Sequence, residues 1–172
     1  MNFQMPVMDP CPFCEIARGP AAWNLLVADP LTLTVLNGRQ YEYGQCIVMP
    51  RRHAPTLLDL TPHEAAAVML AAQRIGAVIT EISGPEALLL YQNNGELAGQ
   101  EVPHFHLHVV PRTRGSDWGL GPAHLARLQP QARPAHLDHA VVTEAKLQTV
   151  RTLQQALGVR HRFPETGSDP NC

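Results

Sequence analysis

The sequence predicts an α+β fold in which an antiparallel sheet is covered by one long helix, with a second helix near the C-terminus. Three observations support this class. Short β-forming runs are joined by tight turns, one long stretch repeats apolar residues at helical spacing, and the helices fall between and after the strands. A chain of 172 residues with 45% hydrophobic content is long enough for one compact domain with a sizeable core.

Five short apolar runs are the predicted strands, and they cover residues 23–28, 31–37, 44–49, 87–92 and 104–110. The turn signal Asp29-Pro30 separates the first two runs, and Pro50 closes the third. A loop that contains glycines and amide side chains, 93–103, precedes the last run. Taken alone, this loop is typical of an ordinary hairpin connection, although its glycines also permit close approach of a ligand.

The long helix is predicted from its start signal and its periodicity. Thr61 is the expected N-cap, Pro62 the first helical residue, and Glu64 completes a capping box. Apolar residues then follow at three- and four-residue spacing and predict one buried stripe: Ala65, Val68, Met69, Ala72, Ile75, Gly76, Ile79 and Ile82. Gly84 ends this helix, and a second helix is expected over 143–157 with Gly158 as its stop.

The chain is expected to divide into a flexible leader (1–10), a functional domain (11–118) and a C-terminal extension (119–172) with one helix and a disordered end. The N-terminus lacks a positive region followed by an apolar run, and no stretch has 18 continuous apolar residues. We therefore expect no signal peptide and no membrane span, and we expect a cytoplasmic protein. The net charge of −2 provides no basic field for nucleic-acid binding.

The last predicted strand carries the chemistry. Alternate residues of a strand share a face, so its residues divide into two sets. Three histidines face one way (His104, His106 and His108), and three apolar residues face the core (Phe105, Leu107 and Val109). Simple exposure to solvent does not call for three imidazoles in a row. A neutral imidazole is a good nucleophile and its neighbours can donate to phosphate oxygens, so this strand predicts phosphoryl-group chemistry.

Cys11 and Cys14 have the spacing of a metal knuckle, which is also the spacing of a redox-active pair. A redox pair of the thioredoxin type follows a strand and opens a helix, whereas this pair precedes every predicted strand. Tetrahedral zinc needs two further ligands, for which His53 and His104 are the candidates. A pair of reduced thiols without metal is the alternative.

Residues 104–110 fit the pattern His-φ-His-φ-His-φ-φ, where φ is apolar, and 93–100 read Asn-x-Gly-x-x-Ala-Gly-Gln. Together they resemble the histidine triad (HIT) family, in its bacterial zinc-containing branch, over about residues 11 to 114. The resemblance implies a HIT domain that hydrolyses nucleoside phosphoramidates or dinucleoside polyphosphates through a nucleotidyl-histidine intermediate and releases a nucleoside monophosphate. A nucleotide-binding signalling protein with little turnover is the alternative.

The resemblance also implies roles for individual residues. His106 corresponds to the nucleophile, and His108 corresponds to a phosphate ligand whose identity favours hydrolysis over nucleotidyl transfer. The remaining nucleotide contacts are Asn37 at the ribose, Asn93 at the phosphate, Phe13, Ile16 and Val35 around the base, and Gly99 and Gln100 along the phosphates. Glu101 departs from the Ser or Thr of the best-known eukaryotic branches, and a carboxylate there would repel an anionic leaving group.

Many bacterial members of the family bind structural zinc, and the matching positions here are Cys11, Cys14, His53 and His104. A closed Cys₂His₂ set leaves no open position for water, so the expected role is structural. The resemblance further implies a purine nucleotide as substrate and a homodimer joined edge to edge through its sheets. The net charge and the lack of a long apolar run predict no nucleic-acid partner and no membrane.

Overall fold

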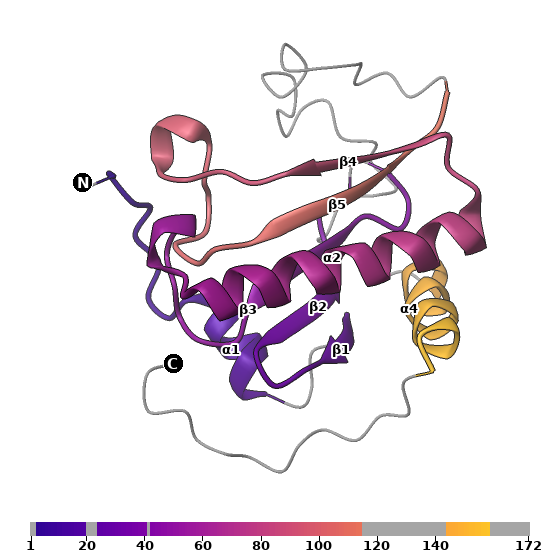
Figure 1. Ribbon diagram of the computed structural model, residues 1–172, viewed down its shortest axis with the longest axis horizontal. Helices are drawn as coiled ribbons and strands as arrows, with labels where there is room; N and C mark the ends of the chain where they lie inside the picture. The colour runs from indigo at the N-terminus through magenta and orange to yellow at the C-terminus, as the bar shows by residue number, and fades with distance from the viewer. Residues whose placement is uncertain (1–2, 20–23, 41, 115–143, 159–172) are drawn as a thin grey trace.

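The computed structural model describes residues 3–19, 24–40, 42–114 and 144–158 (Figure 1). Five strands form one antiparallel sheet in the order β1-β2-β3-β5-β4. The strands are β1 (Leu25–Ala28), β2 (Thr32–Leu36), β3 (Cys46–Pro50), β4 (Ala87–Tyr91) and β5 (Leu107–Arg112). The helices are α1 (Pro12–Arg18), α2 (Pro62–Ser83) and α4 (Glu144–Ala156), with short 3₁₀ turns η1 (Leu57–Asp59) and η2 (Glu96–Ala98). The predicted α+β class is confirmed.

The strand that carries the histidines begins later than predicted. The run 104–110 was expected to be a strand throughout, but β5 begins at Leu107. Before it, the N–H of His104 donates to Val102 and the N–H of Phe105 donates to Ala54, so these residues bond to loops and not to a neighbouring strand. The alternation nevertheless persists, because Phe105, Leu107 and Val109 all join the core.

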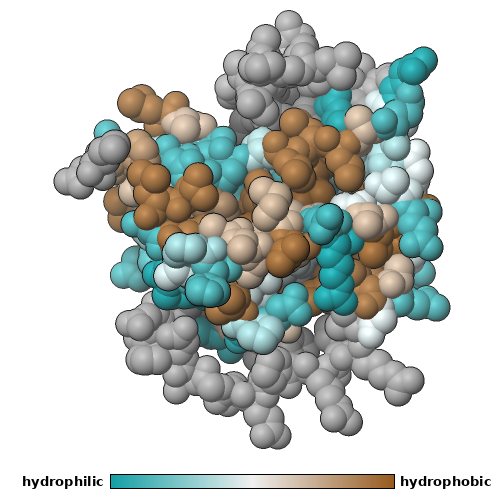
Figure 2. Space-filling model, viewed as in Figure 1, coloured by the Kyte–Doolittle hydropathy of each residue, from teal (hydrophilic) through white to brown (hydrophobic). Residues whose placement is uncertain are grey.

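Helix α2 forms as its sequence signals predict. Thr61 and Glu64 make a reciprocal capping box, and Gly84 closes the helix in the left-handed region at φ 56°. Two residues of the predicted stripe, Met69 and Ile82, are instead 54% and 41% exposed, and part of this outer surface is visible in Figure 2. By length and composition alone α2 could cross a membrane. Its inner face packs on the sheet and is part of the larger hydrophobic cluster, so α2 is a core helix of this domain.

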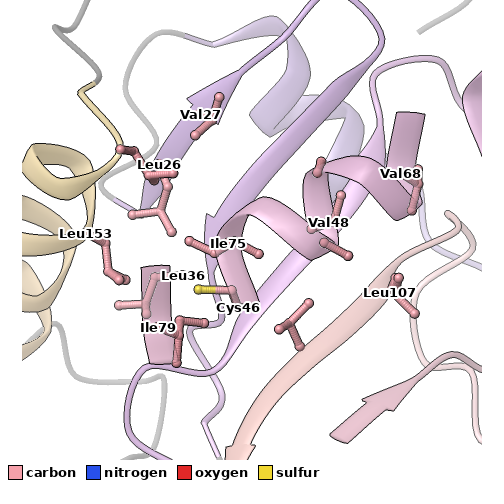
Figure 3. Packing of buried hydrophobic residues seen from close by; sticks show 14 of the residues in the cluster. Leu26, Val27, Leu36, Cys46, Val48, Val68, Ile75, Ile79, Leu107 and Leu153 are labelled. Carbon is pink, nitrogen blue, oxygen red and sulfur yellow. The ribbon is translucent and has the colours of Figure 1, made fainter. Parts of the chain in front are cut away.

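The sheet buries a hydrophobic cluster on each face. The larger cluster lies between the sheet, α2 and α4, and includes Leu36, Ile75 and Leu153 (Figure 3). Side chains that alternate with these along the strands point to the opposite face. There they pack against Phe13 and Ile16 of α1. The sheet is therefore covered on both sides, and α1 is held against the face that also carries the histidines.

Helix α4 is part of the packed domain. Val150 and Leu153 are buried in the larger cluster, and the Gln154 amide donates to the carbonyl oxygen of Leu25 at 2.7 Å. Lys146 is fully buried, with its Nζ 3.4 Å from the carbonyl oxygen of Gly38. The second predicted helix is confirmed over its described part. The predicted strand start at Trp23, the first helical position 143 and the disordered end 163–172 lie outside the described residues.

An ion pair fixes the start of α2 to the segment that carries His53. The Arg52 guanidinium donates to both carboxylate oxygens of Glu64, at 2.9 and 2.8 Å, and to the carbonyl oxygen of Asp59 at 2.8 Å. The Glu64 side chain is only 7% exposed. Hydrogen bonds from Arg52 hold the pKa of Glu64 at about 2, against the opposing effect of burial.

Replacing Glu64 with glutamine should therefore lower the free energy of unfolding by about 2 kcal/mol at neutral pH. Because the folded pKa is depressed, this contribution is complete above the unfolded value of 4.5 and disappears as the pH falls toward 2. Urea unfolding of wild type and Glu64→Gln at pH 7, 4 and 3 should show a narrowing gap. Glu86→Gln, which removes the exposed pair with Arg114, is the control and should change stability by less than about 0.5 kcal/mol.

Candidate active site and metal centre

His106 is held as a neutral imidazole in one tautomer. Its Nδ1–H donates to the carbonyl oxygen of His104 at 2.7 Å, so its lone pair is on Nε2. The side chain is nearly buried, at 9% exposure. Burial lowers the pKa of His106, while the hydrogen bond to His104 and the charge of Glu101 act in the opposite direction. A neutral imidazole with a fixed tautomer is the form that can attack phosphorus.

Phe13 links the short N-terminal helix to the histidines. Its ring meets His106 edge to face, with centroids 5.0 Å apart, and meets His104 in the same manner at 5.9 Å. Phe13 and Ile16 also pack with Val35 in one cluster, so the structure brings together the three residues expected around a base. This arrangement provides an apolar wall beside His106.

Asn37 lies at the end of β2, where it is 7% exposed. Its side-chain oxygen accepts the N–H of Arg39 at 3.1 Å, and its own N–H donates to Gln45 at 2.8 Å. These two bonds fix the backbone on both sides of the residue. Asn37 is thus rigidly placed at the strand end where the sequence analysis expected a ribose contact.

In the loop before the histidines, the groups expected to contact phosphates are used for hydrogen bonds within the protein. The N–H groups of Gly99 and Gln100, predicted to face phosphates, donate to Glu96 and Gly95 within the loop. The Gln100 amide is also occupied, with bonds to Pro55, Val102 and Gly95 at 2.7, 2.9 and 2.7 Å. Asn93 donates one bond to Gly99 at 3.2 Å. Gln100 therefore builds the loop, and of these groups the Asn93 amide keeps a second N–H for a ligand.

His108 has two close contacts that the sequence analysis did not single out. The Gln45 amide nitrogen lies 3.1 Å from Nδ1 of His108, and the ring of Tyr91 stacks on the imidazole with centroids 4.2 Å apart. Burial lowers the pKa of His108 well below its usual value. Tyr91 lies opposite His108 in the pairing of β4 with β5. Its contact with His108 could therefore have been predicted from the sequence if the register of these two strands had been known. Gln45 carries no comparable sequence signal.

An ion pair joins the segment after β2 to the loop before β5. The Arg39 guanidinium contacts the Glu101 carboxylate at 3.0 Å, and the two side chains are 46% and 60% exposed. The carboxylate is close enough to His106 for its charge to raise the pKa of that imidazole. Glu101 thus affects the pKa of His106 directly and is also exposed to solvent.

Four residues gather their ligand atoms into one group: Cys11, Cys14, His53 and His104. These atoms all lie within 4.8 Å of one another. Nδ1 of His53 is 3.3 Å and Nδ1 of His104 is 3.6 Å from the sulfur of Cys14. Two sulfurs and two imidazole nitrogens form the donor set that zinc prefers in closed tetrahedral sites.

The orientation of His104 supports the fit to a metal. Its Nε2–H donates to the carbonyl oxygen of Pro50 at 3.0 Å, which leaves the Nδ1 lone pair directed at the cysteines. Burial lowers the pKa of His104 to about 4, so the ring is neutral at physiological pH. The main chain of the same residue accepts the hydrogen bond from His106. His104 therefore takes part in both sites.

Known proteins resemble this chain over the same region. The HIT domain model matches residues 21–115. An adenylylsulfatase of Arabidopsis thaliana is 33% identical over 102 residues, which cover 59% of this chain and about half (52%) of that protein. An adenosine 5'-monophosphoramidase of Schizosaccharomyces pombe is 31% identical over 64% of this chain and 80% of its own length. A zinc-bound histidine triad protein of Mycobacterium smegmatis superposes with a TM-score of 0.67 at 28% identity, covering 87% of this chain and 94% of that one.

The family model covers more than half of the chain, and its range includes the loop and all three histidines of the signature. The sheet and helices have the fold of the solved relatives. On these grounds the chain belongs to the histidine triad (HIT) family.

Proposed function

We propose that the protein is a nucleotide hydrolase in which His106 attacks the α-phosphorus of a nucleoside phosphoramidate or dinucleoside polyphosphate. The observation that carries this proposal is the 2.7 Å hydrogen bond from Nδ1 of His106 to the His104 carbonyl, which leaves the Nε2 lone pair free. The relatives named as a phosphoramidase and an adenylylsulfatase support a reaction of this class.

Two displacements at phosphorus complete the reaction. In the first, Nε2 of His106 forms a bond to phosphorus while the bond to the leaving nitrogen or oxygen breaks. The leaving group departs with the electron pair and takes up a proton. In the second, water attacks phosphorus, loses a proton, and displaces His106, which releases a nucleoside monophosphate. His108 and the Asn93 amide would donate to the phosphoryl oxygens as negative charge develops.

The rest of the substrate would occupy the adjoining surface. Phe13, Ile16 and Val35 would contact the purine base, and Asn37 would bind the ribose hydroxyls. The N–H groups of Gly99 and Gln100 have no part in this proposal, because both donate within their own loop. A cytoplasmic location belongs to the same proposal.

We propose further that Cys11, Cys14, His53 and His104 hold a structural zinc ion. The matching donor set, the spacing of its atoms and the zinc-bound relative support this assignment. Bound zinc would supply a cross-link and no open position for water. Its four protein ligands would connect α1, the segment after β3 and the segment before β5.

A substrate panel tests the reaction. Purified protein should release a nucleoside monophosphate from adenosine and guanosine phosphoramidates or from diadenosine polyphosphates, as measured by chromatography under steady-state conditions. Negligible turnover of every substrate, together with tight nucleotide binding in calorimetry, would overturn the proposal and favour a nucleotide-binding signalling protein.

Glu101 should set the preference for the leaving group. Its carboxylate would disfavour an anionic leaving group and tolerate a neutral or cationic amine. Glu101→Ser should therefore raise kcat/KM for diadenosine polyphosphates relative to an alkylamine phosphoramidate, by about 10-fold. Glu96→Ser, in the same loop and exposed, is the control. An unchanged ratio in Glu101→Ser would contradict this role.

Strand β4 offers an edge for a second copy. It is an outer strand of the sheet, with Leu88 and Leu90 40% and 45% exposed. Hydrophobic side chains also show over this part of the surface in Figure 2. Unpaired apolar edge strands are prone to pair with another chain, so we propose a homodimer joined at β4.

Leu90→Lys should convert this dimer to a monomer, because a buried ammonium without a partner is costly at the interface. Light scattering over a range of concentrations measures the change in mass. Leu97→Lys, which alters a fully exposed leucine in η2, should leave the dimer intact. A wild-type protein that is monomeric at all concentrations would contradict the proposed interface.

A further inference from the structure

Gln45 is a buried amide that directly contacts the third histidine. It immediately precedes β3 and is 0% exposed. Its N–H donates to Glu42 at 3.1 Å, and its carbonyl oxygen accepts the N–H of Asn37 at 2.8 Å. These main-chain bonds fix the residue, and its side chain places Nε2 3.1 Å from Nδ1 of His108.

His108 is held from both neighbouring strands. In the sheet it lies between Ile47 of β3 and Tyr91 of β4. The Tyr91 ring stacks on the imidazole at 4.2 Å with an interplanar angle of 13°, which restricts the plane of the ring. The contact with Gln45 then determines which edge of the imidazole carries the hydrogen.

The chemistry of an amide decides the tautomer. The nitrogen of a glutamine side chain donates and does not accept, so Nδ1 of His108 must accept from it. A neutral imidazole carries one N–H, which must then be on Nε2. We propose that Gln45 is a positioning residue that keeps His108 in the Nε2–H form, as a permanent hydrogen-bond donor to the substrate.

Two neighbouring histidines are thereby given opposite tautomers. His106 donates through Nδ1–H to the His104 carbonyl, so its Nε2 is unprotonated. His108 accepts at Nδ1, so its Nε2 carries the hydrogen. Their rings are 4.9 Å apart. This division rests on the proposed function, because a bare nitrogen suits attack on phosphorus and an N–H suits a phosphoryl oxygen.

The two tautomers can be read without any turnover. Long-range ¹H–¹⁵N correlation spectra of protein labelled with ¹⁵N-histidine distinguish protonated from bare ring nitrogens. At neutral pH the wild type should show His108 as Nε2–H and His106 as Nδ1–H. A spectrum with the His108 proton on Nδ1 would overturn the proposal. Because this measurement needs no substrate, it fails or succeeds independently of the proposed reaction.

Substitution of Gln45 supplies the second measurement. Gln45→Met keeps the length of the side chain and removes the donor, so His108 should become a mixture of tautomers. With a phosphoramidate substrate, kcat should fall by about 10- to 100-fold with a smaller change in KM. Gln45→His can donate again and should restore the Nε2–H signal and most of the lost kcat.

Gln40→Met is the matched control. Gln40 is another buried glutamine of the same segment, and its side-chain oxygen accepts the N–H of Gly44 at 2.7 Å. This variant should leave the tautomer of His108 unchanged. An unchanged tautomer in Gln45→Met, or an equal shift in Gln40→Met, would overturn the role of Gln45.

Discussion

Replacing His106 with asparagine should lower kcat by about 10⁴-fold or more, because the variant lacks the proposed nucleophile. Asparagine retains a side-chain donor, so the bond to the His104 carbonyl can survive in part. Nucleotide affinity should change little, since the apolar wall and Asn37 are untouched. Initial rates with a fluorogenic adenosine phosphoramidate and titration calorimetry with AMP measure the two effects.

His63→Asn is the control for this experiment, because His63 is exposed in the first turn of α2. It should retain wild-type activity. Wild-type reactions quenched with denaturant at alkaline pH, where a phosphorus–nitrogen bond to histidine survives, should also contain a protein species heavier by one nucleotidyl group. Peptide mass spectrometry should locate this group on His106. Full activity in His106→Asn would rule out the proposed nucleophile.

Replacing Cys14 with serine should remove bound zinc and strongly destabilise the domain. Cys14 is buried and its sulfur lies within 3.6 Å of Nδ1 of both His53 and His104. A ligand that binds only the folded state adds about 4 kcal/mol to the free energy of unfolding when its free concentration is about 1,000 times its Kd. The variant should therefore have a lower Tm, and a chelator should lower the Tm of wild type but not that of the variant.

Cys46→Ala is the matched control for the metal site. Cys46 is completely buried in the core and hydrogen-bonds to the Gly44 carbonyl, and burial raises the pKa of its thiol. The Cys46→Ala variant should be somewhat less stable than wild type, because the substitution leaves a small cavity in the core. It should still contain one zinc per chain in elemental analysis. Wild-type protein expressed with zinc but containing none would contradict the structural zinc and favour a pair of reduced thiols.

The sequence predicted those parts of the fold that are determined by residues close to one another along the chain. The capping box of Thr61 and Glu64 defines the start of α2 because both groups are close in sequence. The alternation of apolar and histidine residues predicted which side chains enter the core, although the strand itself begins only at Leu107. That late start depends on a bond from Phe105 to Ala54, which sequence patterns do not encode.

The candidate site shows the same limit. The group of Cys11, Cys14, His53 and His104 was anticipated from residue types, whereas the contact of Gln45 with His108 depends on the folded position of a single buried amide. The backbone of Gly99 was expected to face a ligand, and only the observed loop shows that its N–H is already used. Long-range and loop hydrogen bonds are settled by tertiary packing, so residue patterns cannot assign them.

The buried contact of Lys146 with the Gly38 carbonyl has a consequence for protein synthesis. Gly38 follows Asn37, and α4 also covers β1 through Gln154 and completes the larger hydrophobic cluster. A ribosome that has translated only to the end of β5 has already made every histidine of the signature. The nascent chain nevertheless lacks the support for the segment around Asn37 until residue 157 emerges, so we expect the docking of this helix to be the last step in forming the proposed nucleotide site during translation.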